Sequence, residues 1–440
     1  MNPRRSLSLA AAIAALLLST QPVTWASTPQ PTEFPPEPFP STYQPLPSRT
    51  TVIEHATIFT GTGQRIDDGS IVLQDGKIAA IGKQVSAPQG ATVIDASGKF
   101  VTPGIIDVHS HLGVYPSPSV SSTANGNEMT NPVTAQVRAE NSVWPQDPGF
   151  NTARAGGVTT LAILPGSGNL IGGRTVVLKN IPATTVQAMK FPDAPYGLKM
   201  ACGENPMRIY GSRHQFPSTI MGDVAGYRQA FADAQAYDQS WKDWEAKVKA
   251  KGHAAAGAPP KRDLKLETLA EVLDGKVNVQ MHCYRADEMA AMLDVSREFG
   301  FKIAAFHHAV EAYKIPKLLA KTHTCAAMWA DWWGFKMEAW DAIRANIAMV
   351  DAAGACALIH SDDPNGIQRL NQEVAKALAA GRRAGMDISD AHAVTWMTLN
   401  PAKVLGLADE IGSLEKGKHA DVVIWSGNPF SVYTRADKVF

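Results

Sequence analysis

Two histidines and an aspartate close an apolar run in the first third of the chain. The run VTPGIIDVHSHLG, residues 101–113, carries Asp107, His109 and His111 at spacings of two residues. Alternate residues of a strand lie on one face, so both imidazoles and the carboxylate would point to one place, where they could share a cation. The pair alone is weak, because 12 histidines in 440 residues give about 0.3 His-x-His pairs per chain by chance. The interpretation therefore depends on ligands elsewhere.

Further imidazoles and carboxylates stand at the ends of later apolar runs. His282 ends the run VNVQMHC, and His307 with His308 ends KIAAFHH. Asp362 follows the run ACALIHS. Imidazole together with carboxylate suits Zn, or else Mn, Fe or Co. If these runs are neighbouring strands of one sheet, the sequence predicts a metal site at their ends.

Apolar strand candidates alternate with helical stretches over the middle of the chain. The strands are expected at 101–108, 158–164, 175–179, 197–202, 277–283, 302–308, 323–330 and 355–360. Helices are expected at 286–299, 313–321, 337–353 and 371–384. Eight β-plus-connection units over about 300 residues predict an α/β fold of the (β/α)8 TIM-barrel type. Active sites of such barrels lie at the carboxyl ends of the strands, where the histidines stand.

Short β-rich segments flank the predicted barrel domain, residues 101–405. Residues 50–100 hold short β-rich runs with a hairpin turn at Asp75-Gly76, and residues 406–440 return to a β pattern. We expect these two segments to form a composite β-sandwich domain built from both termini. The long connection 223–272 carries a Trp-bearing amphipathic helix and an AAAGAPP tract. We interpret that connection as a surface excursion or a lid.

The N-terminus has the features of a targeting segment. Arg4 and Arg5 precede an apolar run, and small residues follow near Ala26. The apolar run has about 12 residues, fewer than the roughly 20 that span a bilayer. We therefore expect a signal peptide at 1–26, then a Pro-rich linker at 27–49. Export to the periplasm or the medium is predicted, and a retained anchor is the alternative.

Charge and cysteine content narrow the class of partner. Lys+Arg and Asp+Glu are both 41, so no net field attracts nucleic acid or, after signal cleavage, a membrane. A small-molecule substrate is expected, and a homo-oligomer is left open. No Cys-x-x-Cys occurs, and we expect buried free thiols at all four cysteines, which are Cys202, Cys283, Cys325 and Cys356.

Several runs together resemble one known family. PGIIDVHSH, the lead-in DGKIAAIG and the tail NPAKVLGLADEIGSLEKGKHADVVIW are similar to the amidohydrolase superfamily, and within it to the imidazolonepropionase-like or prolidase-like branch. The resemblance covers about 50–440. It implies a barrel with a composite β-sandwich, one or two divalent metal ions with zinc favoured, and hydrolysis of C–N bonds. By position it implies a ligand set of His109, His111, His282, His308 and Asp362.

Three ligand positions keep two candidates each, namely His307 or His308, Asp362 or Asp363, and Lys199 or Glu204. The family pattern favours His308 and Asp362. At the fourth strand, relatives with two metals use a carboxylated lysine or a glutamate. Lys199 in GLKMAC resembles the first and is slightly preferred, while Glu204 in GENP resembles the second. Asp107 and His360 are expected to support the ligands from behind.

The resemblance implies hydrolysis of a C–N bond by metal-activated hydroxide, with Asp362 as general base and acid. A dipeptide or an N-acyl amino acid is the expected substrate, contacted by Tyr284, Arg285 and Lys336. The nearest alternative is a mononuclear deaminase or a cyclic amide or imidazolone hydrolase, for which Glu288 could shuttle protons. A metal- or ligand-binding protein without turnover is the remaining alternative.

Overall fold

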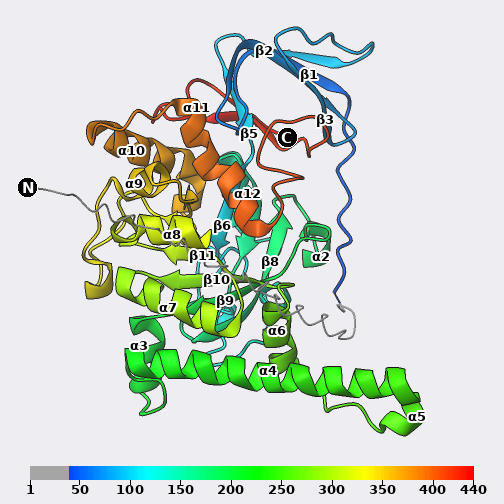
Figure 1. The fold of residues 1–440 in the computed structure, drawn as a ribbon. Helices are drawn as coiled ribbons and strands as arrows, with labels where there is room; N and C mark the ends of the chain where they lie inside the picture. The colour runs from blue at the N-terminus through cyan, green and yellow to red at the C-terminus, as the bar shows by residue number, and fades with distance from the viewer. Residues whose placement is uncertain (1–38) are drawn as a thin grey trace, which may run out of the picture. The chain divides into compact units, whose positions relative to one another are not determined.

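The computed structural model of the protein describes residues 39–440. In this range the chain forms an eight-stranded sheet surrounded by helices, and a separate seven-stranded sheet (Figure 1). The predicted signal peptide, 1–26, and the first part of the predicted linker lie outside the described residues. Among residues 39–440, no helix has both the length and the hydropathy needed to cross a bilayer.

The eight-stranded sheet follows the order of the chain and nearly closes into a barrel. Its strands are β6 (Ile105–Ser110), β7 (Val158–Ile163), β8 (Ile171–Lys179), β9 (Gly197–Ala201), β10 (Asn278–Cys283), β11 (Ile303–His308), β12 (Cys325–Met328) and β13 (Ala357–Ile359). At the open edge the amide of Asp362 donates to the carbonyl of His109 at 2.9 Å. This bond links the segment after β13 to β6. The predicted barrel class is confirmed.

Strand β8 departs from a regular (β/α)8 barrel. It runs antiparallel to both β7 and β9, whereas the other neighbouring strands are parallel. Residues 164–170 join β7 to β8 without a helix. Such a short connection can join only antiparallel neighbours, because a parallel crossover needs a dozen or more residues.

Helices surround this sheet, with one exception. The helices are α1 (Pro148–Ala155), α2 (Val186–Met189), α3 (Glu204–Gly211), α4 (Ile220–Lys251), α5 (His253–Ala256), α6 (Leu264–Leu273), α7 (Ala286–Phe299), α8 (Pro316–Thr322), α9 (Asn346–Ala352), α10 (Leu370–Arg383), α11 (Asp390–Ala393) and α12 (Leu399–Leu405). The exception is α5, which lies apart from the sheet at the end of α4 (Figure 1). The helix expected at 337–353 is wrong in its first half, because 340–345 is irregular and only α9 follows. Pro316 starts α8, where its missing N–H leaves no bond unmade.

The long connection 223–272 is only partly a surface excursion. Helix α4 buries one face of its first two thirds, down to Trp241, and packs against α6 and α7. Its remaining turns carry few apolar side chains and extend past α6 to α5 (Figure 1). The Tyr227 hydroxyl on α4 donates to the carbonyl of Ala201 at the end of β9. The buried half of α4 is therefore part of the scaffold and not a lid.

The second sheet is built from both ends of the described chain. Its strands are β1 (Thr51–Phe59), β2 (Arg65–Gln74), β3 (Lys77–Gly82), β4 (Thr92–Asp95), β5 (Phe100–Pro103), β14 (Val422–Trp425) and β15 (Ala436–Val439). Strand β14 pairs antiparallel with β5, and β5 pairs with β1, so strands from both ends of the described chain lie in one sheet. The hairpin turn at Asp75-Gly76 has φ of 51° and 72°, as a type I′ turn requires.

The four cysteines form two disulfides, so the expected free thiols are wrong. Cys202 pairs with Cys283, and Cys325 pairs with Cys356. Members of each pair are 81 and 31 residues apart in the sequence, but neighbouring strands bring their Cα atoms to 5.3 and 4.5 Å. The pairing depends on the strand order, which the spacing of the cysteines does not reveal.

Trp425 at the end of β14 anchors the C-terminal segment. It is 1% exposed, its ring lies over Gly157, and its Nε1 donates to Thr102 Oγ1 at 2.9 Å. We expect Trp425→Ala to lower the free energy of unfolding by about 3–5 kcal/mol, because a large buried side chain leaves a cavity. Urea denaturation measures the loss. The matched control Tyr433→Ala, 93% exposed, should change it by at most about 0.5 kcal/mol; equal effects would contradict the anchoring role.

Candidate functional site

Imidazoles from several strands meet at the carboxyl ends of the barrel strands. His109 lies on β6, His282 on β10, and both His307 and His308 end β11. The His308 ring centroid lies 5.0 Å from that of His109 and 4.4 Å from that of His282. The strand register pairs His282 with His307 across β10 and β11, which brings both strand ends to one level. The structure therefore gathers the histidines that the sequence placed at strand ends.

Asp362 faces both histidines of the His-x-His pair. Its Oδ1 lies 3.0 Å from His111 Nε2 and 3.4 Å from His109 Nε2. The other ring nitrogen of His111, Nδ1, lies 2.8 Å from the carbonyl oxygen of Leu164. Since a carbonyl only accepts, Nδ1 carries a proton, which leaves Nε2 as the ring nitrogen that a cation held between His111 and Asp362 would use. These three residues form a group that could bind a metal.

A chain of side chains sets the orientation of His109 in the same way. His307 Nε2 lies 2.7 Å from Gln280 Oε1, and His307 Nδ1 lies 3.0 Å from His109 Nδ1. The amide oxygen accepts from Nε2, so His307 Nδ1 accepts from His109 Nδ1. His109 Nε2 is left with a lone pair directed into the site. His307 uses both of its ring nitrogens inside the protein.

His308 differs from His307 in this respect. Its Nδ1 is buried without a hydrogen-bond partner, as are the Nδ1 atoms of His282 and His360. Buried polar atoms are nearly always paired, so unpaired ring nitrogens gathered in one place fit a bound cation. His109, His308 and His360 form a second group whose ligand atoms all lie within 4.8 Å of one another. The arrangement favours His308 over His307 and adds His360 as a direct ligand candidate.

Two of these residues have unusual backbone conformations. The φ angles are 71° at His308 and 57° at Asp362, in the left-handed region that non-glycine residues rarely adopt. His308 is the last residue of β11, and Asp362 lies three residues after the end of β13. Backbone strain of this kind clusters at functional sites.

Burial keeps the imidazoles neutral. Desolvation lowers the pKa well below the ordinary value at His109, His282, His307 and His308, and to about 3 at His360. Burial alone would raise the pKa of Asp362, but the hydrogen bond from His111 and the positive charges around it lower the pKa overall. Neutral imidazole and ionised carboxylate are the forms that bind a metal.

Lys199 and Glu204 lie in different places. Lys199 on β9 is 1% exposed, and its Nζ lies 3.1 Å from both His109 Nε2 and the carbonyl oxygen of Pro165. Burial lowers the pKa of Lys199 to about 8. Glu204 starts α3, and its Oε1 lies 3.4 Å from Lys336 Nζ. The structure therefore brings Lys199 among the histidines and leaves Glu204 at the rim.

Asp107 lies behind the ligands, at the seam between β6 and the segment after β13. Its Oδ1 accepts from the amides of His109 and Ser361, both at 3.1 Å, and its Oδ2 accepts from Ser361 Oγ at 2.5 Å. Burial raises the pKa of Asp107 to about 7 in spite of these bonds. Asp107 thus holds the strand ends that carry the ligands.

The three residues predicted to contact the substrate do not lie together at the rim. Lys336 Nζ lies 4.1 Å above the Tyr284 ring, so these two residues are together near His282. Arg285 instead pairs with Asp287 at 3.0 Å, and half of its side chain is exposed. It is not brought to the histidines, because it precedes α7 and bonds to the first turn of that helix.

The sequence interpretation missed two polar residues of the site. Gln280, which orients His307, lies two residues before His282 on the same strand, so face alternation was a usable signal. Asn205 Nδ2 lies 3.4 Å from His282 Nε2, and Lys336 Nζ donates to Asn205 Oδ1 at 3.1 Å. No spacing in the sequence connects Asn205 to these two.

Comparison with known proteins agrees with this geometry. The model of the amidohydrolase family matches residues 100–439. The amidohydrolase tasK of Hapsidospora irregularis is 33% identical over 87% of this chain, which spans only 42% of the length of that relative. The imidazolonepropionase of Mesorhizobium japonicum is 23% identical over 82% of this chain and 87% of its own.

Comparison with solved structures also indicates the amidohydrolase family. An amidohydrolase from Thermotoga maritima is 35% identical, with a TM-score of 0.80 over 89% of this chain and 97% of its own. A putative prolidase from Bifidobacterium longum shares the fold, with a TM-score of 0.52 at 17% identity over 87% of this chain and 90% of its own. With imidazoles and a carboxylate gathered at the barrel strand ends, the chain belongs to the amidohydrolase family and is a hydrolase acting on C–N bonds.

Proposed function

We propose that this protein is a metal-dependent amidohydrolase that cleaves an amide or peptide-like C–N bond of a small substrate, a dipeptide or an N-acyl amino acid. One observation carries the proposal. His109 Nε2 and His111 Nε2 lie 3.4 Å and 3.0 Å from Asp362 Oδ1. The Nδ1 atoms of both rings have other partners in the protein, His307 and the carbonyl of Leu164. This presents three acceptor atoms to one point, which is what a divalent cation requires.

The residues present fit a divalent metal, with zinc preferred for imidazole and carboxylate ligands. When bound, such an ion would lower the pKa of a water molecule to about 7 and polarise a carbonyl group. His109, His111 and Asp362 would hold it, and His282, His308 and His360 supply further ring nitrogens. Lys199 would help to hold a second ion if its amine added CO2 and lost a proton to become a carbamate. A pKa of about 8 leaves part of that amine unprotonated at neutral pH.

Asp362 is the proposed general base and acid. It is ionised at neutral pH, because His111 and the surrounding positive charges lower its pKa. It accepts a proton from the attacking water and delivers that proton to the leaving nitrogen as the C–N bond breaks. Asp363, its neighbour, instead accepts hydrogen bonds from the amides of Asn365 and Gly366, so it is engaged in a turn.

A hydrolase of a cyclic amide or imidazolone is the second candidate, supported by the likeness to an imidazolonepropionase over 82% of the chain. A mononuclear deaminase would need Glu288 at the histidines, whereas Glu288 contacts Cys202 at 3.5 Å. We also propose export from the cell on the basis of residues 1–26.

We expect Asp362→Asn to lower kcat by about 10²–10⁴-fold, because the amide cannot take the proton. Activity on a panel of dipeptides, N-acyl amino acids and lactams measures this, with the metal content of each preparation checked first. Asp363→Asn is the matched control, and its kcat should stay within a few-fold of the wild type. A metal-loaded Asp362→Asn enzyme with wild-type turnover would remove Asp362 from this role.

Metal analysis separates the candidates. Two ions per chain, falling to one or none in Lys199→Ala, support the carbamate-bridged hydrolase. One ion per chain in both proteins favours the mononuclear alternative. Removal of metal with a chelator should abolish activity, and zinc should restore it. Full activity of a metal-free preparation would overturn the proposal.

The buried imidazoles should stay neutral where ordinary histidines protonate. Because burial lowers their pKa, the five buried histidines of the metal-free protein should not titrate between about pH 7.5 and 5.5, a range around the usual value. NMR of isotope-labelled histidine measures this. His55 is the control: its hydrogen bond to Asp68 raises its pKa, so it should gain a proton already above pH 6.5. Protonation of the five buried rings in the same pH range as His55 would contradict this expectation.

A further inference from the structure

A row of aromatic side chains runs outward from the site histidines. The Trp329 ring stacks on His308 with centroids 4.4 Å apart and lies 4.9 Å from the His360 ring. The Trp332 ring lies 4.6 Å from Trp329, and the Phe335 ring lies 5.7 Å from Trp332. We call Trp329, Trp332 and Phe335 the aromatic row. Its inner end touches the proposed ligands and its outer end reaches solvent.

The outer members are unusually exposed for their size. Trp329 is 7% exposed, but Trp332 is 42% and Phe335 is 50% exposed. Both follow β12, on the segment that forms one side of the barrel mouth. Large apolar side chains grouped on a surface mark a binding site more often than single ones do. Here the group is continuous with the reaction centre.

A cavity of about 320 Å³ lies against the two tryptophans of the aromatic row. Trp329, Trp332, His360 and Ser361 are among its lining residues, and Ser361 directly precedes Asp362. The volume falls at the lower end of the range for small-molecule sites, about 300–1,000 Å³. The cavity shares His360 with one of the candidate metal groups, so a substrate group held in it would lie beside the reaction centre.

The two carboxylates that also line this cavity are already engaged. Asp363 accepts from backbone amides of its own turn. Glu373 Oε2 accepts from the amide of Ala330 at 3.2 Å, and Glu373 also pairs with Lys376. With Glu373 paired with Lys376 and Asp363 Oδ2 bonded to two backbone amides, the aromatic faces are the main apolar surface left for a ligand. The chemistry fits an uncharged aromatic group better than a cation.

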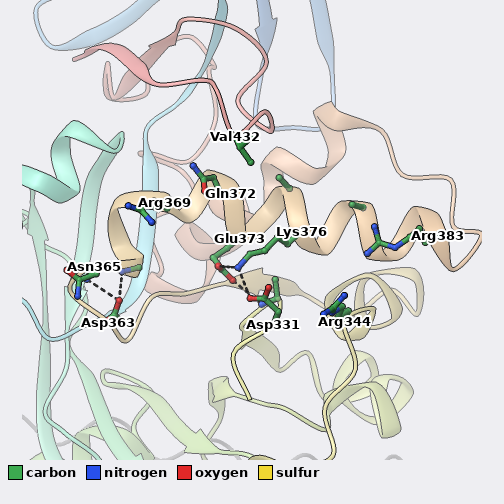
Figure 2. Close-up of a pocket in the computed structure, with 14 residues that line it drawn as sticks. Asp331, Arg344, Asp363, Asn365, Arg369, Gln372, Glu373, Lys376, Arg383 and Val432 are labelled. Atoms are coloured by element: carbon green, nitrogen blue, oxygen red, sulfur yellow. Dashed lines mark hydrogen bonds and ion pairs between the residues drawn. The ribbon is translucent and has the colours of Figure 1, made fainter. Parts of the chain in front are cut away.

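Ion pairs fix the segment that carries the row. Lys376 on α10 pairs with Asp331 at 2.6 Å and with Glu373, and Figure 2 shows these three side chains together. They line a neighbouring cavity of about 650 Å³ that none of the site histidines lines. Asp331 lies directly before Trp332, so the pair ties the aromatic row to α10. The ion pair and the stacking of Trp329 on His308 favour one position of the row before a substrate arrives.

We propose that the aromatic row and the adjoining cavity bind an uncharged aromatic side chain of the substrate, next to the scissile C–N bond. This inference rests on the proposed amide hydrolysis and narrows its substrate class. Trp332 is the residue that sets the preference, because it is exposed in the free protein and would be covered by the bound ring. Flat, rigid aromatic side chains favour stacking with another aromatic ring.

The test compares matched substrates in the metal-loaded enzyme. N-acetylphenylalanine is paired with N-acetylalanine, and the four dipeptides Phe-Gly, Ala-Gly, Gly-Phe and Gly-Ala cover both sides of the bond. In the wild type, kcat/KM should favour the aromatic member of at least one pair by about 10-fold or more, the range of apolar pocket discrimination. Trp332→Ala should remove most of that preference.

The expected change in Trp332→Ala is specific. KM for the aromatic substrate should rise while kcat and the alanine substrate change little, because an apolar wall binds ground state and transition state alike. A merely structural role would lower kcat for both substrates. Trp340→Ala is the matched control, since Trp340 is 66% exposed on the same segment and none of the described ring contacts includes it.

The outcomes separate this inference from the proposed function. Turnover of all pairs without an aromatic preference overturns the inference and leaves the hydrolase intact. No turnover of any amide overturns the proposed function. Calorimetric titration with phenylalaninamide and alaninamide then decides the inference alone. Binding of the aromatic amide at least about 10-fold tighter, lost in Trp332→Ala, supports it, and equal binding of the two amides overturns it.

Discussion

The seam between the first and last barrel strands is the contact on which the site depends. Asp107 accepts the amides of His109 and Ser361 and the Ser361 hydroxyl, while the amide of Asp362 bonds to the His109 carbonyl. The bonds to Ser361 and from Asp362 join residues more than 250 positions apart. They place the Asp362 carboxylate opposite both imidazoles of the His-x-His pair. Without this seam the eight strands would form an open sheet, and the aspartate would have no fixed position.

Neighbouring groups then prepare the ligand atoms. Leu164 fixes the proton of His111, and the pair Gln280 and His307 fixes that of His109. Burial keeps the imidazoles neutral, so they are ready for a cation without first losing a proton. The orientation, the tautomer and the charge state of the ligands are therefore set by residues that never touch the substrate. At metal sites in proteins, residues around the ligands commonly set ligand orientation and protonation in this way.

Some of this architecture could be predicted from the sequence, because it depends on local periodicity. The spacing of His109 and His111 and the apolar runs before His282 and His308 are local features. They were sufficient for the barrel class and for the gathering of the histidines. The family resemblance then supplied the reaction class. The choice between Lys199 and Glu204 stays a prediction, although only Lys199 lies among the histidines.

Other features depend on contacts between distant segments, which no local pattern contains. The direction of β8 follows from a short connection that could equally have been read as the start of a crossover. Cys202 and Cys283 become partners only because β9 and β10 are neighbours. The same is true of Trp329, whose position on His308 needs the pairing of β11 with β12. Gln280 could have been predicted, because it lies two residues before His282 and therefore on the same face of the strand.

The left-handed backbone of His308 and Asp362 has a consequence for the balance between stability and activity. Each such residue costs the fold of the order of 1–3 kcal/mol, which must be offset by the packing around it. A ligand that binds only the folded state returns stability by mass action. The metal would then stabilise the folded protein in addition to taking part in the reaction. Sequence changes that relax these two turns should give a sturdier protein and a poorer enzyme.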